Sequence, residues 1–190
     1  MKSLIIFDLD YTLFKTEAKV ALYENGEYVK HFSSSHEYYQ HLKIKKDHHT
    51  YDFKEYTSAI SFKEQAEPIH HIIDRMREAI LDDNSDVVLL TARNQIDDMG
   101  IFRGVFEDYD LDTRRIEFEF SGDIRDRFGR KNITVAEAKV WVIKNKYLPL
   151  EIYNVVEMYD DLNDNLALFS RLRYDYKDIE FKPFLVKETK

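Results

Sequence analysis

Four short, largely apolar runs recur along the chain, and polar residues follow most of them. The first covers residues 3–8 (SLIIFD), and the others cover residues 86–91 (DVVLLT), 115–120 (RIEFEF) and 152–160 (IYNVVEMYD). Apolar runs of this length are typical of strands that are buried on both faces of a parallel sheet. The pattern therefore predicts four strands of one central sheet.

Helical periodicity lies between these runs. In residues 64–81, isoleucine and methionine recur at spacings of three and four, which predicts an amphipathic helix with Pro68 in its first turn. Residues 134–146 begin with Thr134 and Glu137, the spacing of a capping box, and continue as a second helix. Strands that alternate with helices predict an α/β fold, a three-layer sandwich whose central parallel sheet is covered on both faces.

One segment interrupts this alternation. Residues 19–32 (KVALYENGEYVKHF) read as two short strands joined at Asn25-Gly26, a strong signal for a two-residue hairpin turn. The stretch that follows is rich in tyrosine and histidine and shows no clear second core. We therefore expect a single core domain over residues 1–190, with a small cap inserted at about 16–63 above the end of the first strand.

Composition narrows the functional classes. The chain has 190 residues, of which 44% are hydrophobic, so it can build a sizeable core and disorder is excluded. A net charge of −8 argues against broad, sequence-independent binding of nucleic acid, although a local basic pocket remains compatible with it. The absence of cysteine excludes disulfides, thiol catalysis and cysteine-based zinc sites. No apolar run could span a bilayer, so we expect a cytoplasmic protein without a membrane partner.

Chemically active side chains follow three of the predicted strands. In open α/β sheets, ligands bind at the carboxyl ends of the strands, where these residues would meet. They are Asp8 and Asp10 after the first strand, Thr91, Ala92 and Arg93 after the second, and Asp160, Asp161 and Asp164 after the fourth. The predicted helix from residue 134 adds one cation, Lys139.

This set of residues suits phosphoryl transfer to an aspartate. Asp8 and Asp10 would share one face of an extended strand, where their repulsion raises both pKa values unless a cation binds. Clustered carboxylates suit Mg²⁺, one carboxylate can attack phosphorus, and a second can transfer protons. A hydroxyl group and an ammonium group can then hold the oxygens of the transferring phosphoryl group.

Four stretches, FDLDYTLF, LLTARN, AEAK and MYDDLNDNL, together resemble the four motifs of the haloacid dehalogenase (HAD) superfamily of phosphohydrolases. The resemblance covers about residues 3–14 and 64–170 and implies a Rossmann-like core, an Mg²⁺ cofactor and phosphatase activity. It implies that Asp8 is the nucleophile and that Asp10 is the general acid/base. The acid at Asp10 favours phosphatase over dehalogenase chemistry, because the dehalogenase branch lacks an acid there.

The resemblance also assigns the remaining positions. Thr91 corresponds to the phosphate-binding hydroxyl, with Ala92 and Arg93 beside it, and Lys139 corresponds to the cation of the third motif. Lys131, Lys144 and Lys146 are rivals for that cation. The predicted metal ligands are Asp8, Asp10 (through its backbone carbonyl), Asp160, Asp161 and Asp164. Two positions depart from the pattern, since Tyr11 and Tyr159 stand where many members have glycine.

The substrate is the least constrained part of the prediction. A short insertion leaves the site open, which favours a large phosphorylated substrate such as a nucleotide or a nucleic-acid end. Short members of this kind resemble HAD-type proteins encoded by phages. The alternatives are a phosphatase acting on small metabolites and a non-catalytic module that binds phosphate, although a pure binder has no use for Asp10.

Two basic runs bear on the substrate. In the insertion, Lys43, Lys45, Lys46, His48 and His49 form either a solvated surface or a contact for an anionic substrate, with stacking faces on Tyr38, Tyr39 and Tyr51. The run from Arg125 to Lys131 has the same two interpretations. His70 and His71 are adjacent on a predicted helix and point in different directions, so they are not a metal pair.

Overall fold

The computed structural model describes residues 2–32, 37–38, 41, 44, 46–129 and 132–187. A five-stranded sheet in the order β10-β9-β1-β7-β8 forms its centre, and every neighbouring pair is parallel. Its strands are Lys2–Phe7 (β1), Ser85–Thr91 (β7), Ile116–Phe120 (β8), Tyr153–Asp160 (β9) and Glu180–Leu185 (β10). The four predicted strands are confirmed, and β10 is a fifth strand at the edge of the sheet.

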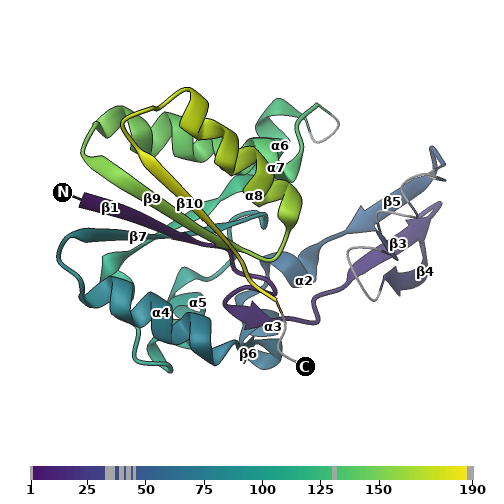
Figure 1. Cartoon of the computed structure of the whole chain (residues 1–190). Coiled ribbons are helices and arrows are strands. Elements are labelled where there is room, and N and C mark those ends of the chain that lie inside the picture. The colour runs from purple at the N-terminus through teal and green to yellow at the C-terminus, as the bar shows by residue number, and fades with distance from the viewer. Residues whose placement is uncertain are drawn as a thin grey trace.

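Helices cover both faces of this sheet (Figure 1). One face carries α4 (His70–Leu81) and α5 (Met99–Glu107). The other face carries α6 (Ser121–Phe128), α7 (Val135–Val142) and α8 (Asn163–Ser170). The predicted three-layer α/β sandwich is therefore confirmed.

The central strand β1 contributes to both cores. Ile5 and Phe7 lie in the cluster under α4 and α5, whereas Leu4 and Ile6 lie in the cluster under α7 and α8. All four side chains are at most 3% exposed. Because successive strand residues point to opposite faces, a continuous apolar run is what a strand covered on both sides requires.

The predicted helix over residues 64–81 is wrong in its first part. Glu67–Pro68 form a short strand, β6, which pairs with Phe14–Lys15 (β2), and α4 begins only at His70. Pro68 therefore lies in a two-stranded ribbon, where it pairs with Phe14 and its missing N–H is tolerated at an edge. The preceding residues form a separate helix, α3 (Ala59–Gln65), which packs against α5.

The second predicted helix begins as expected. Thr134 and Glu137 form the complete capping box, and α7 follows directly. The α-helix ends at Val142, however, and the chain continues as a π-helical turn over Ile143–Tyr147 and a 3₁₀ turn over Leu148–Leu150. Two further 3₁₀ turns cover Thr113–Arg115 and Arg171–Tyr174.

The insertion forms a small antiparallel sheet that projects from the core (Figure 1). Its strands are Val20–Glu24 (β3), Glu27–Phe32 (β4) and His49–Asp52 (β5), in the order β4-β3-β5, followed by the short helix α2 (Lys54–Thr57). The hairpin turn at Asn25 and Gly26 is confirmed, since both residues have positive φ, 51° and 85°. We call residues 16–57 the cap.

The described residues of the cap form a small apolar interior. Val20, Leu22 and Phe32 are buried there, and aromatic rings of Tyr38, Tyr51, Phe53 and Tyr56 pack against them. Among the residues that the structure describes, none of the helices is both long and apolar enough to cross a lipid bilayer.

Candidate active site

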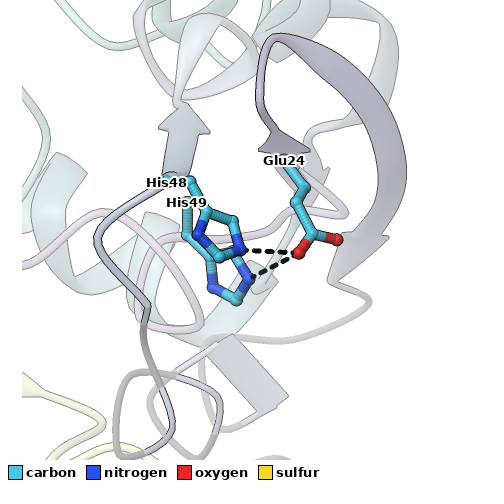
Figure 2. Close-up of side chains that lie close together, drawn as sticks. All are labelled: Glu24, His48 and His49. Atoms are coloured by element: carbon cyan, nitrogen blue, oxygen red, sulfur yellow. Dashed lines mark hydrogen bonds and ion pairs between the residues drawn. The ribbon is translucent and has the colours of Figure 1, made fainter.

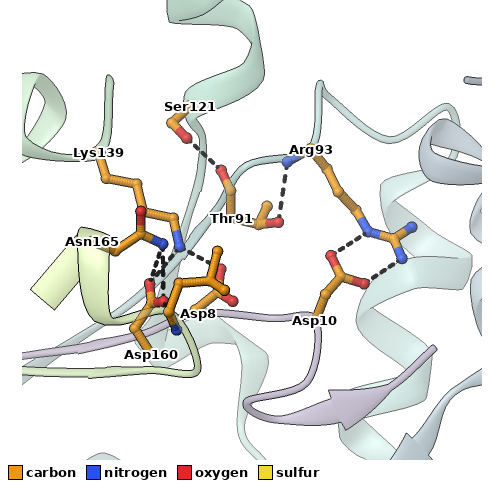
Figure 3. Close-up of polar contacts among 9 residues, drawn as sticks. Asp8, Asp10, Thr91, Arg93, Ser121, Lys139, Asp160 and Asn165 are labelled. Atoms are coloured by element: carbon orange, nitrogen blue, oxygen red, sulfur yellow. Dashed lines mark hydrogen bonds and ion pairs between the residues drawn. The ribbon is translucent and has the colours of Figure 1, made fainter. Parts of the chain in front are cut away.

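Six of the predicted site residues meet at the carboxyl ends of β1, β7 and β9 (Figure 3), namely Asp8, Asp10, Thr91, Arg93, Lys139 and Asp160. The pairing of Phe7 with Tyr159 aligns the ends of β1 and β9, and the Asp8 N–H donates to the Tyr159 carbonyl at 3.0 Å. Asp8 and Asp160 are therefore neighbours although they are far apart in the sequence. Figure 3 shows the side chains of Lys139, from α7, and Asn165, from α8, directed toward these carboxylates.

Lys139 joins these two carboxylates. Its Nζ donates to Asp8 Oδ1 at 2.6 Å and to Asp160 Oδ2 at 2.7 Å, and the lysine is only 1% exposed. Burial alone would lower the pKa of Lys139, but the charges of Asp160 and Asp8 outweigh it and raise the pKa, so the ammonium form persists. A buried charge of this kind is stable only with such partners.

Asp160 is fully buried and held from three sides. Besides Lys139, it accepts hydrogen bonds from Asn165 Nδ2 at 2.9 and 3.0 Å and from the Leu162 N–H at 2.9 Å. Sequence reasoning missed Asn165 because it considered only acidic residues in this stretch. Asp164, the predicted ligand, is exposed in the first turn of α8.

The carboxylates of Asp8, Asp160 and Asp161 form one cluster, with one oxygen of each within 4.8 Å of the others. Burial raises the pKa of Asp8 well above its usual value, although the Lys139 charge opposes this. Burial and the Asp160 charge raise the pKa of Asp161 to about 6. Asp8 and Asp161 thus resist carrying negative charge beside Asp160, a situation that a bound cation relieves.

Asp10 lies on the other side of the same loop and binds Arg93. The Arg93 Nε donates to Asp10 Oδ2 at 2.9 Å and Nη2 donates to Oδ1 at 2.6 Å, a bidentate pair. The Thr16 hydroxyl also donates to Oδ1 at 2.6 Å. Burial would raise the pKa of Asp10, but the Arg93 charge and these hydrogen bonds outweigh it and lower the pKa.

Arg93 connects Asp10 to the cap. Its Nη1 donates to the Tyr56 carbonyl at 3.1 Å, and its guanidinium lies over the rings of Tyr56 and Phe62 at 5.1 and 5.3 Å. Sequence reasoning placed Arg93 near the phosphate and missed Thr16 and Tyr56, because neither residue belongs to a motif. In this structure the guanidinium of Arg93 pairs with Asp10. Its contact with phosphate stays a prediction.

The loop that follows β7 rests on α6. Thr91 is fully buried, and its Oγ1 accepts a hydrogen bond from the Arg93 N–H at 3.2 Å. The Ser121 hydroxyl donates to the Thr91 carbonyl at 2.8 Å, and the Gly122 N–H donates to the Arg93 carbonyl at 3.0 Å. A Cβ on Gly122 would lie 2.6 Å from the Arg93 carbonyl carbon and oxygen, so only glycine fits. Ala92 lines the cavity described below.

The two departures from the HAD pattern have structural explanations. Tyr11 has a φ of +57°, a backbone conformation that favours glycine, and its hydroxyl donates to the Thr16 carbonyl at 3.0 Å. Tyr159 stacks between Phe7 and Phe184, with ring centroids 4.9 and 4.6 Å apart. Tyr11 thus joins the loop after Asp10 to Thr16, and Tyr159 packs the end of β9 against β1 and β10.

Two of the three rival lysines lie away from the aspartates. Lys144 pairs with Asp175 at 3.1 Å and Lys146 with Glu119 at 2.5 Å, both at the surface. Lys131 lies outside the described residues. Thr12 is fully buried in the same loop as Asp8, and within the described part of the chain its Oγ1 has no hydrogen-bond partner.

A cavity of about 790 Å³ extends from the aspartates to the cap. Asp8, Asp10 and Lys139 line it, and Arg125 also contributes to its lining. Aromatic side chains form much of the rest, namely Tyr11, Tyr38, Tyr51, Phe53 and Tyr56. The predicted stacking residues Tyr38 and Tyr51 are therefore in the cavity wall, whereas Tyr39, Lys43, Lys45 and Lys131 fall outside the described residues.

No protein-family model matches the chain, and no curated protein matches its sequence. Among solved structures, the fold is similar to that of the HAD domain of the effector protein Lem4 from Legionella pneumophila, with a TM-score of 0.50. The match covers 98% of this chain and 86% of that chain at 11% identity. At this identity the likeness shows the fold alone, which is the predicted HAD-like fold. The phage-type subgroup stays a prediction.

Proposed function

We propose that this chain is a Mg²⁺-dependent phosphomonoester hydrolase of the HAD superfamily that acts through an aspartyl-phosphate on Asp8. The observation that carries this proposal is the geometry at the strand ends. Asp8 lies with Asp160, Asp161 and the Lys139 ammonium in one cluster, while Asp10, two residues on, has its own partners in Arg93 and Thr16. Separate partners for two neighbouring carboxylates allow one to act as nucleophile and the other to transfer protons. A module that only binds phosphate has no use for this arrangement.

The proposed reaction has two steps. An Asp8 carboxylate oxygen attacks phosphorus, the bond to the ester oxygen breaks, and Asp10 gives its proton to the leaving oxygen. Water then attacks phosphorus while Asp10 takes one of its protons, and cleavage of the bond to Asp8 releases phosphate and restores the carboxylate. Lys139 holds Asp8 through Oδ1 during both steps, and Thr91 remains the predicted hydroxyl partner of the phosphoryl oxygens.

The residues that would hold Mg²⁺ are Asp8, Asp160 and Asp161, with the backbone carbonyl of Asp10. Their donor atoms are all oxygens, which suits Mg²⁺. When bound, the ion supplies positive charge that reduces the repulsion between Asp8 and the phosphate dianion. The chain contributes the orientation of Asp160, which Asn165 and the Leu162 N–H hold in place. Asp164, exposed on α8, is outside this proposal.

For the substrate we propose a phosphate attached to a planar group, in a nucleotide or at the end of a nucleic acid. The cavity has the size of a small-molecule site, and the rings of Tyr38, Tyr51, Phe53 and Tyr56 line it on the cap side. Stacking of a base on an aromatic ring contributes about 1–3 kcal/mol. The net charge of −8 disfavours long contacts with a nucleic-acid backbone, so a single nucleotide or an end fits better.

A panel of phosphomonoesters tests this function. Release of inorganic phosphate is measured with and without Mg²⁺ on an aryl phosphate, mononucleotides, oligonucleotides with 3′- or 5′-phosphates, and sugar phosphates. The expected result is Mg²⁺-dependent turnover that is lost in Asp8→Asn. Asp164→Asn is the matched control, because it removes the same charge at an exposed position in the first turn of α8.

The substrate class is tested separately with Tyr51→Leu. We expect a higher KM for nucleotides and an unchanged KM for sugar phosphates, because only the former would stack. Sugar phosphates that turn over better than any nucleotide or oligonucleotide would favour a small-metabolite phosphatase. Absence of turnover across the whole panel, with Mg²⁺ present, would favour the phosphate-binding module.

A further inference from the structure

A second group of metal-binding side chains lies at the outer end of the cap, away from the aspartates. Glu24 is the last residue of β3 and His49 is the first residue of β5, and the two pair directly across the antiparallel ladder. His48 precedes β5 in a turn that is fixed by a 3.1 Å hydrogen bond from the Asn25 N–H to the His48 carbonyl. The fold thus brings one carboxylate and two imidazoles to one corner.

Both imidazoles face the same carboxylate oxygen (Figure 2). His48 Nε2 lies 2.7 Å and His49 Nε2 lies 3.9 Å from Glu24 Oε1, and ligand atoms of the three residues all lie within 4.8 Å of one another. The two rings are nearly perpendicular, at 88°. Ligand atoms that share a zinc ion at about 2.0–2.2 Å lie roughly 3.5 Å apart, so small side-chain rotations would suffice.

One of the two imidazoles is shielded from solvent. His49 is largely buried, and the His41 ring stacks on it with centroids 5.1 Å apart. The stacked ring limits the positions that the His49 imidazole can take, so its Nε2 stays directed toward Glu24.

We propose that Glu24, His48 and His49 bind a divalent transition-metal ion of the Zn²⁺ class, independently of the Mg²⁺ proposed for the aspartates. Two imidazole nitrogens and one carboxylate oxygen suit Zn²⁺, Co²⁺ or Ni²⁺, whereas Mg²⁺ prefers oxygen ligands alone. Three protein ligands leave a fourth position for water. This site does not depend on the proposed hydrolase activity.

Lys46 opposes binding at this site. Its Nζ lies 3.9 Å from Glu24 Oε1, and its backbone N–H lies 3.4 Å from His49 Nδ1. Ligation through His49 Nε2 places the ring proton on Nδ1, so a metal ion would displace both contacts. The Lys46 side chain is 63% exposed, and its ammonium can therefore turn into solvent at little cost. Removal of this ammonium should strengthen metal binding.

Because His49 also lines the large cavity, a bound ion would have a structural consequence. It would join the end of β3 to the start of β5 and fix the His49 ring at the cap side of the cavity. The cap has a small apolar interior, and a small sheet of this kind gains stability from a metal that links its strands. The inferred role is therefore to stabilise the outer end of the cap.

Isothermal titration of the whole chain with Zn²⁺ tests the inference, with saturating Mg²⁺ present so that the aspartates are occupied. We expect one binding event in the wild type, at least roughly 100-fold weaker binding in Glu24→Gln and His48→Ala, and tighter binding in Lys46→Met. His71→Ala is the control, because it removes an exposed histidine from α4 and should leave the affinity unchanged. The visible spectrum of bound Co²⁺ should show four- or five-coordination with nitrogen ligands.

Equal Zn²⁺ affinity in the wild type and in Glu24→Gln would overturn the inference, as would an octahedral, all-oxygen Co²⁺ spectrum. Weaker binding in Lys46→Met would also contradict it, because that lysine would then help rather than oppose the ion. Far-UV circular dichroism checks that each variant folds. If His48→Ala does not fold, Glu24→Gln and the Co²⁺ spectrum of the wild type decide the question.

Discussion

Asp8 and Asp10 are two residues apart on one loop, yet they are held by different parts of the molecule. The contacts of Asp8 come from the core, through Lys139 on α7 and the neighbouring Asp160 on β9. The contacts of Asp10 come from Arg93 and Thr16, at the junction with the cap. We call these two groups the core half and the cap half of the site.

This difference separates two tasks. The core half collects carboxylates around one ammonium, so it is an electrostatic site that a cation would complete. The cap half neutralises one carboxylate with a guanidinium that also contacts Tyr56 in the cap. A movement of the cap would therefore reach Asp10 before it reached Asp8. Substitutions that change one half at a time can therefore test this separation.

The largest effect is expected for Lys139→Met in the core half. Without the ammonium, Asp8 and Asp160 become buried charges without a cationic partner, and loss of one partner of a buried ion pair costs about 3–5 kcal/mol. Urea unfolding of the metal-free protein measures this loss. Added Mg²⁺ should restore part of the stability, because it supplies positive charge to the same carboxylates.

Lys144→Met is the matched control for this variant, because its surface pair with Asp175 should contribute under about 1 kcal/mol. If the two lysine variants lose similar stability, the ammonium of Lys139 is not what holds the core half together.

The next effect concerns the cap half and its pH dependence. Arg93 lowers the pKa of Asp10 below its usual value against the effect of burial, so Arg93→Gln should raise that pKa. Asp10 must carry a proton to act as the acid, and the protonated fraction falls as the pH rises through its pKa. The descending limb of kcat/KM against pH should therefore move to higher pH in Arg93→Gln.

Thr16→Val provides a smaller change at the same carboxylate, since it removes one hydrogen bond and no charge. In Thr16→Val the descending limb of kcat/KM against pH should also move to higher pH, but by less than in Arg93→Gln. A limb that stays in place in Arg93→Gln, or moves to lower pH, would show that Asp10 is not the acid.

Gly122→Ala should affect the cap half alone. The new Cβ would lie 2.6 Å from the Arg93 backbone and push the loop away from α6, at a cost of about 1–3 kcal/mol in the free energy of unfolding. Turnover should fall because Arg93 shifts, whereas Mg²⁺ affinity should stay unchanged. Calorimetric Mg²⁺ titration and urea unfolding measure the two quantities.

Gly104→Ala is the control, because a Cβ at this position of α5 has no atom within 4 Å and should stabilise the helix slightly. A loss of Mg²⁺ affinity in Gly122→Ala would mean that the two halves are not separate.

The core half was largely predictable from the sequence. Asp8, Asp160 and Asp161 directly follow or end apolar strands, so the order of hydrophobic and acidic residues is enough to place them at one edge of the sheet. Lys139 could be named only through its motif, because a lone lysine on a helix carries no such signal. Asn165 was missed, since adjacent residues in a helix point in different directions and the packing of α8 decides which one faces Asp160.

The cap half was much less predictable. The hairpin at Asn25-Gly26 could be read from its turn residues, because both need positive φ. The pairing of Arg93 with Asp10 joins residues 83 positions apart, and the contacts with Tyr56 and Thr16 depend on how the cap returns to the core. The chain that leads from the cap back to the core contains Pro68 in β6. The local sequence there predicts a helix, but Pro68 pairs with Phe14 in a two-stranded ribbon instead. Long-range pairing of this kind leaves no local pattern.

The smallest effect is a gain of stability in the core half, in Asp161→Asn. The pKa of Asp161 is raised to about 6 in the folded chain, so the folded state binds its proton more tightly than the unfolded state, and stability falls as the pH rises from about 4 to 6. The asparagine removes this penalty, which for a half-buried, solvent-screened group we place at about 1 kcal/mol. Metal-free Asp161→Asn should therefore be more stable than the wild type at pH 7.5 and equally stable at pH 4, whereas exposed Asp164→Asn should match the wild type at both. With Mg²⁺ at pH 7.5 the wild type should be the more stable of the two, because the variant has lost a metal ligand. If urea unfolding with Mg²⁺ still shows the variant to be more stable, Asp161 is not part of the proposed Mg²⁺ site.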